Sequence, residues 1–158
     1  AALLSPPIDE SGLASTPLFT EPFLLACPAD HRLAQAGRIS ATDLAGPDLL
    51  LLDEGNCLRD QALAACETTS AGRHATSLET LRSMVAAGGG YTLLPRLAAR
   101  AEPEAGDLVV CRPLGGGDDQ PGRTVALVWR ASDPRSGDFA ELARFFRDHA
   151  PDGTRRVT

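Results

Sequence analysis

Lysine is absent from the sequence, and the basic residues are arginines throughout its 158 positions. No group of these arginines forms a run or stripe suited to a phosphate backbone, and the formal net charge is −6. We therefore expect this chain to make no direct contact with nucleic acid.

Long apolar runs are missing as well. The aliphatic run from Leu49 to Leu52 is far shorter than the roughly 20 apolar residues of a membrane-spanning helix. The N-terminus has no starting Met, no basic flank and no long apolar stretch, so it does not resemble a secretory signal. We expect no membrane contact and a cytoplasmic location.

The cysteine and histidine patterns exclude several kinds of site. The four cysteines, at positions 27, 57, 66 and 111, form no Cys-x-x-Cys pair, and no histidine stands at metal-ligand spacing. Nucleophile-elbow, zinc-protease and phosphate-loop motifs are also absent. We therefore expect no metal, no cofactor and no enzymatic activity. Three histidines are expected at the surface or at helix caps: His31, His74 and His149.

Short apolar runs alternate with amphipathic segments, which is typical of an α/β protein with a parallel or mixed sheet. The opening residues AALLSPP indicate the end of a buried strand, so we expect the chain to start inside one. Further strands are expected at 17–28, with a break or edge at Pro22, and at 48–53, 91–95, 107–114 and 123–130. Helices are expected at 57–67, from 76 to the glycines at 88–90, and at 138–150. A short helix followed by a loop is expected over 96–107, and loops are expected over 68–73 and 115–122.

Capping and packing signals refine these helices. Thr76 and Glu79 have the spacing of a capping box, and Ser40 or Thr42 could cap a short helical piece before Gly46. The tail 151–158 is expected to fray. The inward faces of the second and third helices are expected to carry Leu78, Leu81, Met84 and Val85, and Leu142, Phe145 and Phe146.

Cys57 and Cys66 lie nine residues apart in one predicted helix, in the stretch DEGNCLRDQALAAC. An intact helix would separate their α-carbons by about 13.5 Å, whereas a disulfide needs them within roughly 7 Å. A bond between them therefore requires this segment to unwind. Spacing alone leaves two interpretations open: buried thiols without a function, which is the commoner case, and a redox pair. Cys27 and Cys111 are expected to be core residues.

The surroundings of Cys57 favour reactivity. A thiolate in the first turn of a helix is stabilised by the helix dipole and by free backbone N–H groups. Arg59 adds positive charge, whereas Asp60 opposes ionisation but could hydrogen-bond a water or a peroxide oxygen. Cys66 lies among alanines and has no such activating neighbours.

Several segments together resemble the regulatory domain of the peroxide-sensing LysR-type transcription regulators. They are PLFTEPFLLACPADHRLA, GNCLRDQALAAC, ATSLETLRSMVAAGGGYTLLP and GRTVALVWR, and the resemblance covers about residues 17–148. CLRDQ followed by a second Cys is the most specific motif, while ATSLETLR…TLLP is shared more widely among LysR-type effector domains.

The resemblance implies a periplasmic-binding-protein-like fold with two α/β half-domains joined by crossover strands. Residues 1–22 would complete the first half-domain, 23–122 would form the second, and 123–158 would return to the first. The first half-domain would then be incomplete, and the DNA-binding winged helix-turn-helix would lie outside this chain. DNA would be bound only through that missing N-terminal domain.

The resemblance also implies residue roles. Cys57 would be the peroxidatic thiol that hydrogen peroxide oxidises to a sulfenic acid, and Cys66 the resolving thiol that forms a disulfide with it. Asn56, Arg59, Asp60 and Arg123 would form the thiolate and peroxide pocket. Formation of the disulfide would alter the packing of a homodimer or tetramer, and glutaredoxin or thioredoxin would reduce it again. An effector cleft would include Thr76, Ser77 and Leu78, within a wall extending to Leu81.

One position departs from the family pattern, and other functions stay open. The family usually has His before the reactive Cys, where this chain has Asn56, which can cap a helix but cannot carry a proton charge. Alternative functions are a LysR-type domain that senses a small organic effector, with incidental cysteines, a thiol peroxidase, and a solute-binding protein of the same fold.

Overall fold

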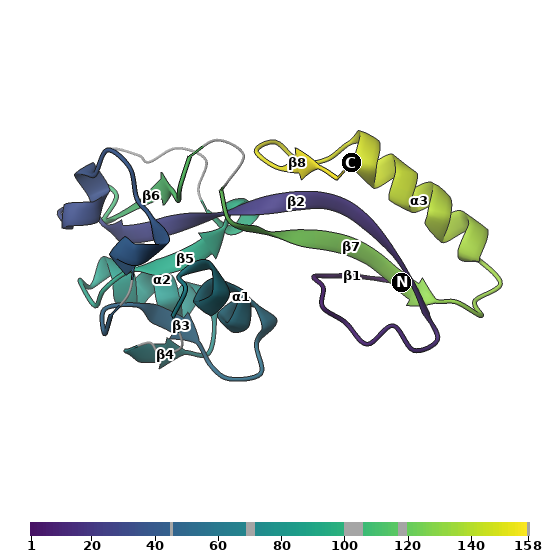
Figure 1. The fold of residues 1–158 in the computed structure, drawn as a ribbon, viewed down its shortest axis with the longest axis horizontal. Helices are drawn as coiled ribbons and strands as arrows, with labels where there is room; N and C mark the ends of the chain where they lie inside the picture. The colour runs from purple at the N-terminus through teal and green to yellow at the C-terminus, as the bar shows by residue number, and fades with distance from the viewer. Residues whose placement is uncertain (45, 69–71, 100–105, 117–119, 158) are drawn as a thin grey trace. The chain divides into compact units, whose positions relative to one another are not determined.

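The computed structural model describes residues 1–158 except 45, 69–71, 100–105, 117–119 and 158. The chain divides into two compact units: Ala1–Pro22 with Arg123–Thr158, and Phe23–Gly122. Both contain strands and helices (Figure 1), which confirms the expected α/β class. The expected loops over 68–73 and 115–122 lie partly outside the described residues, as does the expected short helix and loop over 96–107, whose first residues, Arg96–Ala98, form a 3₁₀ helix. Within the described part of the chain, no helix is long and apolar enough to cross a membrane.

The first unit contains a small sheet built on two long strands. Strand β7 (Gly122–Arg130) lies between β2 (Leu13–Pro28) and β1 (Ala2–Leu4), and it pairs antiparallel with β1. All three β1 residues are exposed, so the expected burial of this opening strand is wrong. In the described chain β1 is an edge strand paired with β7 alone.

The C-terminal tail also belongs to this sheet. Strand β8 (Arg155–Arg156) pairs antiparallel with β2 at Phe19 and Thr20. The expectation of a frayed tail is therefore wrong at these residues, because hydrogen bonds to β2 satisfy their backbone groups.

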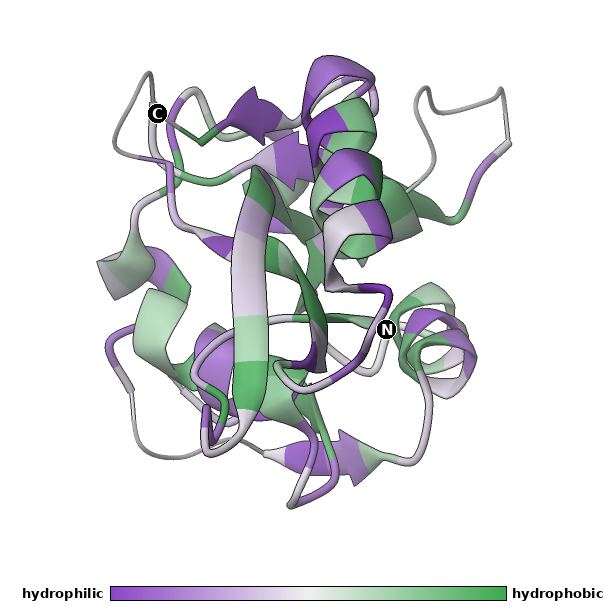
Figure 2. Cartoon of the chain, turned by 90° about the vertical axis from the view of Figure 1, so that its right-hand side faces the viewer, coloured by the Kyte–Doolittle hydropathy of each residue, from purple (hydrophilic) through white to green (hydrophobic). Residues whose placement is uncertain are grey.

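Helix α3 (Ser136–Asp148) packs on the apolar residues of this unit through Phe139, Ala143 and Phe146. These positions follow the i, i+4, i+7 spacing of one helical face. Phe146 is thus placed as expected, but Leu142 and Phe145 are 39% and 55% exposed. Each lies one residue, about 100° of helix rotation, away from that face. Figure 2 shows that both hydrophobic and hydrophilic residues occur along each helix. The buried cluster comprises Leu18, Phe19, Leu127, Trp129 and Ala143.

Strand β2 continues into the second unit with Pro22 inside it, so the expected break at Pro22 does not occur. There it pairs antiparallel with β5 (Thr92–Pro95) and β6 (Val109–Pro113). Strand β3 (Leu50–Leu52) is fully buried and pairs in parallel with β4 (Arg73–Ala75), which confirms the buried parallel strand expected at 48–53. Strand β4 was not predicted, because three mostly exposed residues carry no strand pattern.

Helices α1 (Cys57–Ala65) and α2 (Leu78–Ala86) contribute apolar residues to the core of this unit. Short 3₁₀ helices occupy Arg32–Gln35, Ala41–Leu44 and Arg96–Ala98. At the start of the second, the backbone N–H and the Oγ of Ser40 both donate hydrogen bonds to the Asp43 Oδ2. The core contains Phe23, Leu25, Cys27, Leu33, Ile39, Leu44, Leu49, Leu50, Leu51, Leu52, Leu58, Ala62, Cys66, Ala75, Leu81, Val85, Tyr91, Leu93 and Leu114.

The start of α2 differs from the sequence-based prediction, whereas its end agrees with it. Ser77 is the N-cap, and its Oγ accepts a hydrogen bond of 3.1 Å from the Thr80 backbone N–H. The capping box predicted between Thr76 and Glu79 is therefore wrong by one residue, because two adjacent residues can both cap. The helix ends before Gly88, whose φ of 76° is in the left-handed region, as its glycines predict.

Candidate functional site

The turn from β3 into α1 places Cys57 at the first position of a helix. Gly55 adopts a φ of 84° in this turn, and Asn56 follows as the N-cap. The Asn56 Oδ1 accepts a 3.1 Å hydrogen bond from the Leu58 backbone N–H. Cys57 is exposed and is a free thiol. The sequence-based placement of Cys57 in the first turn is confirmed.

Cys66 lies at the opposite end of the same helix in a different environment. It is the C-cap residue, and its N–H donates to the Ala62 carbonyl at 3.0 Å. Its side chain is 1% exposed within the core of the second unit. Burial raises the pKa of the Cys66 thiol from 9 to about 11. The two thiols of α1 therefore differ in access: one meets solvent, and the other is buried and neutral near pH 7.

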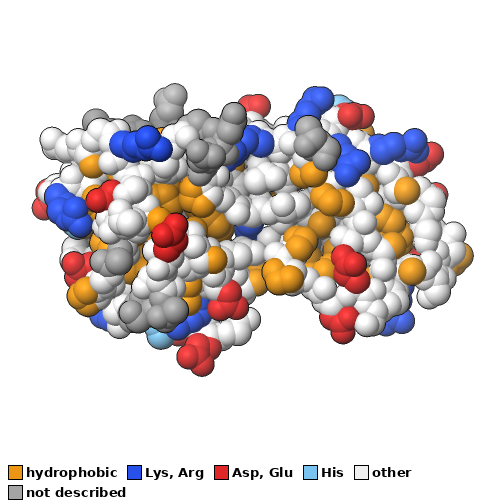
Figure 3. Space-filling view, viewed as in Figure 1, with side chains coloured by type: hydrophobic (Ala, Val, Ile, Leu, Met, Phe, Trp, Pro, Cys, Tyr) orange, Lys and Arg blue, Asp and Glu red, His pale blue; other side chains and the backbone are white. Residues whose placement is uncertain are grey.

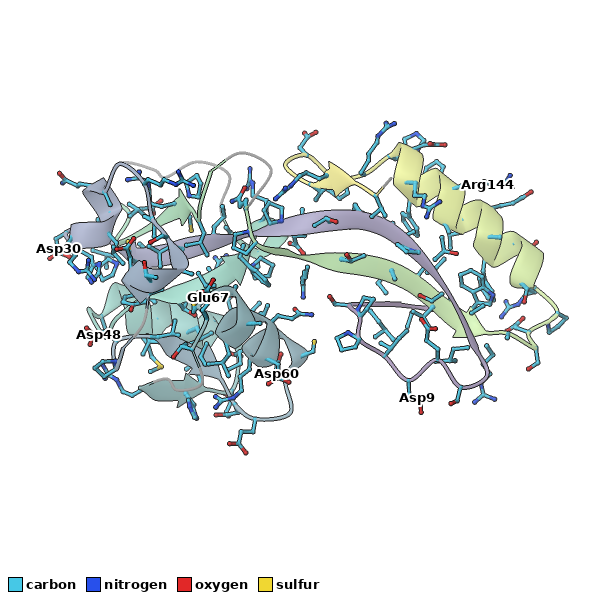
Figure 4. All side chains as sticks on the ribbon, viewed as in Figure 1. Asp9, Asp30, Asp48, Asp60, Glu67 and Arg144 are labelled. Atoms are coloured by element: carbon cyan, nitrogen blue, oxygen red, sulfur yellow. The ribbon has the colours of Figure 1, made fainter. Side chains whose placement is uncertain are left out.

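The first turn of α1 also carries the two charged residues expected beside Cys57. Arg59 is half-buried, and its guanidinium is engaged elsewhere: one terminal nitrogen donates to the Leu52 carbonyl at 3.1 Å and lies 3.0 Å from the His74 Nε2. Asp60 is exposed in the first turn of α1 (Figure 4). The structure thus holds Arg59 against β3 and β4.

Arg123 belongs to the first unit, at the start of β7. Its Nε donates to the Glu21 Oε2 at 2.9 Å, and the Glu21 side chain is fully buried. The Arg123 side chain is partly exposed, so its guanidinium can donate to further partners. A role for Arg123 toward Cys57 stays a prediction.

The expected effector-cleft residues surround the start of α2. Thr76 and Ser77 are exposed, with Ser77 occupied as the N-cap, while Leu78 is partly buried against the core. Their part in binding an effector likewise stays a prediction.

A cavity of about 610 Å³ lies between α2, β5 and β6, apart from Cys57 and Cys66. Its lining includes Arg82, Arg96 and Cys111. Cys27 is buried as expected, whereas Cys111 is only partly buried, because its side chain lines this cavity. Sequence patterns missed the cavity because its walls come from several elements that only the folded chain brings together.

Other candidate chemistry is sparse in the described part of the chain. Among these residues no group of three or more His, Cys, Asp or Glu side chains could hold a metal ion. His31 caps a 3₁₀ helix by accepting from the Leu33 N–H, His149 is the C-cap of α3, and His74 is exposed, as expected of surface and capping histidines. On the face in view in Figure 3, acidic and arginine side chains are interspersed, without a stripe of one sign.

Comparison with known proteins places this chain in a family. The model of the LysR substrate binding domain matches residues 1–151. A hydrogen peroxide-inducible genes activator of Pectobacterium carotovorum is 43% identical over 152 residues, which are 94% of this chain and 49% of that protein. The chain therefore spans about half the length of the curated relatives it matches.

Solved structures support the same family assignment. The reduced form of OxyR matches with a TM-score of 0.81 and 41% identity, covering 95% of this chain and 70% of that one. The oxidised form of OxyR matches with a TM-score of 0.77 and 42% identity, covering 92% and 69%. The periplasmic-binding-protein-like fold expected from the resemblance is confirmed, and this chain belongs to the LysR substrate-binding domain family.

Proposed function

We propose that this chain is the regulatory domain of a LysR-type transcription regulator that senses hydrogen peroxide through a reversible Cys57–Cys66 disulfide. The observation that carries the proposal is the placement of an exposed thiol and a buried thiol at opposite ends of one nine-residue helix. The name of the Pectobacterium relative supports peroxide as the signal.

The first step is oxidation of Cys57. Its thiolate attacks one peroxide oxygen, the O–O bond breaks, and Cys57 sulfenic acid forms with release of hydroxide. The start of α1 favours this step, because the positive end of the helix dipole stabilises the thiolate and the side chain is open to solvent. Asp60, exposed in the same turn, is proposed to help organise the bound peroxide.

The second step joins the two sulfurs. The Cys66 sulfur attacks the sulfenic sulfur, a disulfide forms, and water leaves. On the intact helix the two α-carbons are about 13.5 Å apart, beyond the roughly 7 Å that a disulfide allows. Helix α1 must therefore unwind, and Cys66 must leave the core. Oxidation and refolding of this segment become one event.

The refolded segment is proposed to transmit the signal. Leu58 and Ala62 are buried through α1, so unwinding removes them from the core together with Cys66. The resulting surface would change the packing of a homodimer or tetramer and thereby the DNA contacts of the N-terminal domain. A glutaredoxin or thioredoxin would return the disulfide to two thiols by exchange.

Peptide mapping tests the proposal directly. Trypsin cleaves after arginine here, so Cys57 and Cys66 fall in the peptides 39–59 and 60–73. After a small molar excess of peroxide, a linked pair of these peptides is expected without reductant, and dithiothreitol should separate them. Cys111→Ser is the matched control and should still form the linked pair. No linkage in the wild type, or a linked pair containing Cys111 instead, would contradict the proposal.

A further inference from the structure

Arg59 connects the first turn of α1 to two strands through a single nitrogen. That nitrogen lies 3.1 Å from the Leu52 carbonyl oxygen, at the end of β3, and 3.0 Å from the His74 Nε2 on β4. A terminal guanidinium nitrogen carries two N–H groups, so it can serve both acceptors at once. The contact joins Arg59, two positions after Cys57, to both strands of the parallel β3–β4 pair.

We infer that this contact, the Arg59–His74 latch, holds α1 in its helical form and so limits the formation of the Cys57–Cys66 disulfide. Arg59 is thereby a positioning residue, and His74 is the acceptor that fixes its direction. The inference rests on the proposed function, because it assigns a control on the second of the two oxidation steps.

The chemistry of the two side chains makes the latch specific. A guanidinium only donates hydrogen bonds, so the His74 Nε2 must accept, which requires a neutral imidazole with its proton on Nδ1. The other acceptor is the carbonyl of Leu52, a residue only 4% exposed. Unwinding of the first turn withdraws Arg59 from this buried carbonyl, and a buried acceptor that loses its partner is unfavourable. The latch therefore opposes the unwinding that the disulfide requires.

This role differs from the one expected from the sequence. The sequence suggests that Arg59 acts through its charge on the Cys57 thiolate, which would affect the first step, sulfenic acid formation. The latch acts on the second step, when the helix opens. Replacing His74 keeps the guanidinium and removes one of its acceptors, so it separates the two roles.

The test uses His74→Ala, His74→Gln and, as a matched control, His149→Ala, another exposed histidine. Rates of sulfenic acid formation are measured with peroxide in a Cys66→Ser background by a sulfenic-acid-specific label. Rates of disulfide formation are measured with both thiols present. Loss of one hydrogen bond predicts condensation about five-fold faster in His74→Ala, with the first step unchanged. His74→Gln should restore the wild-type rate, because its amide oxygen can accept from Arg59.

Two further readouts complete the test. The Cys57–Cys66 disulfide should be more stable in His74→Ala than in the wild type. In glutathione buffers, the ratio [GSH]²/[GSSG] at which half of the protein is oxidised should therefore be about five-fold higher in this variant. Amide hydrogen exchange over residues 57–65 of the reduced protein should be about five-fold faster in His74→Ala alone. Equal exchange in the wild type and His74→Ala, or failure of glutamine to rescue, would overturn the latch. A wild type that forms no Cys57–Cys66 bond contradicts the proposed function instead, and hydrogen exchange still decides whether the latch holds α1.

Discussion

Replacing the N-cap of α1 should make the Cys57–Cys66 disulfide easier to form. Asn56 accepts a hydrogen bond of 3.1 Å from the Leu58 N–H, which stabilises the helical, reduced segment. In the oxidised protein this segment cannot be helical from end to end, so the cap has no role there. Asn56→Ala therefore destabilises the reduced form and leaves the oxidised form nearly unaffected.

The size of the effect follows from the cost of losing a cap. Replacing an asparagine N-cap with alanine costs about 1 kcal/mol. For a two-electron couple about 1.4 kcal/mol corresponds to about 30 mV, so the reduction potential of the disulfide should become more negative by about 20 mV. Asn56→Ser should leave the potential within a few millivolts of the wild type, because the serine hydroxyl also caps.

Equilibration in glutathione buffers, followed by acid quenching and mass spectrometry of alkylated thiols, measures this potential. The comparison of alanine with serine isolates the cap, since both side chains are uncharged and small. A positive shift in Asn56→Ala, or equal shifts in both variants, would refute the coupling between helix stability and disulfide formation. Far-UV circular dichroism of the two oxidised variants should be the same, because neither retains an intact α1.

Three further perturbations concern stability. Arg123→Met removes the charge-assisted hydrogen bond that Arg123 Nε donates to the buried Glu21 carboxylate and should lower the free energy of unfolding in urea by about 2 kcal/mol. A variant as stable as the wild type would refute this. Burial raises the pKa of Cys66 from 9 to about 11, so the neutral thiol contributes to the free energy of unfolding below pH 9. This contribution, up to about 3 kcal/mol, is lost as the pH rises from 9 to 11. Cys66→Ala should therefore flatten the dependence of the free energy of unfolding on pH between 9 and 11, and an unchanged slope would count against this reasoning. Gly90 has a φ of 134°, and an added Cβ would lie 2.1 Å from a backbone oxygen. Gly90→Ala should therefore lower the free energy of unfolding, measured by thermal unfolding, by at least about 2 kcal/mol. Gly137→Ala, where an added Cβ on α3 meets open space, should not lower it.

The local features of the site could be predicted from the sequence because they depend on neighbouring residues. Gly55 and Asn56 mark the turn and the cap, so they place Cys57 at the start of α1 without reference to the rest of the fold. The end of the helix is less certain from such signals, and α1 stops two residues before the predicted limit, since Cys66 and Glu67 leave the helical conformation.

Partners distant in the sequence could not be predicted in the same way. The charge of Arg59 suggested a contact with Cys57, yet its acceptors are Leu52 and a histidine on a strand of three residues. The tail strand β8 is equally hidden, because its two arginines have no strand preference and pair with β2 only in the folded chain. In both cases tertiary contacts, which local patterns do not encode, decide the outcome.

Under the proposed function, the difference in burial between the two thiols determines the peroxide threshold. In that mechanism oxidation of exposed Cys57 requires no rearrangement, whereas disulfide formation requires buried Cys66 to leave the core with Leu58 and Ala62. The cost of that second step includes the Asn56 cap, the Arg59–His74 latch and the apolar contacts of α1. Each can change without altering either sulfur. Substitutions along α1 and β4 should therefore tune how much peroxide produces a lasting disulfide, while the chemistry at Cys57 remains the same.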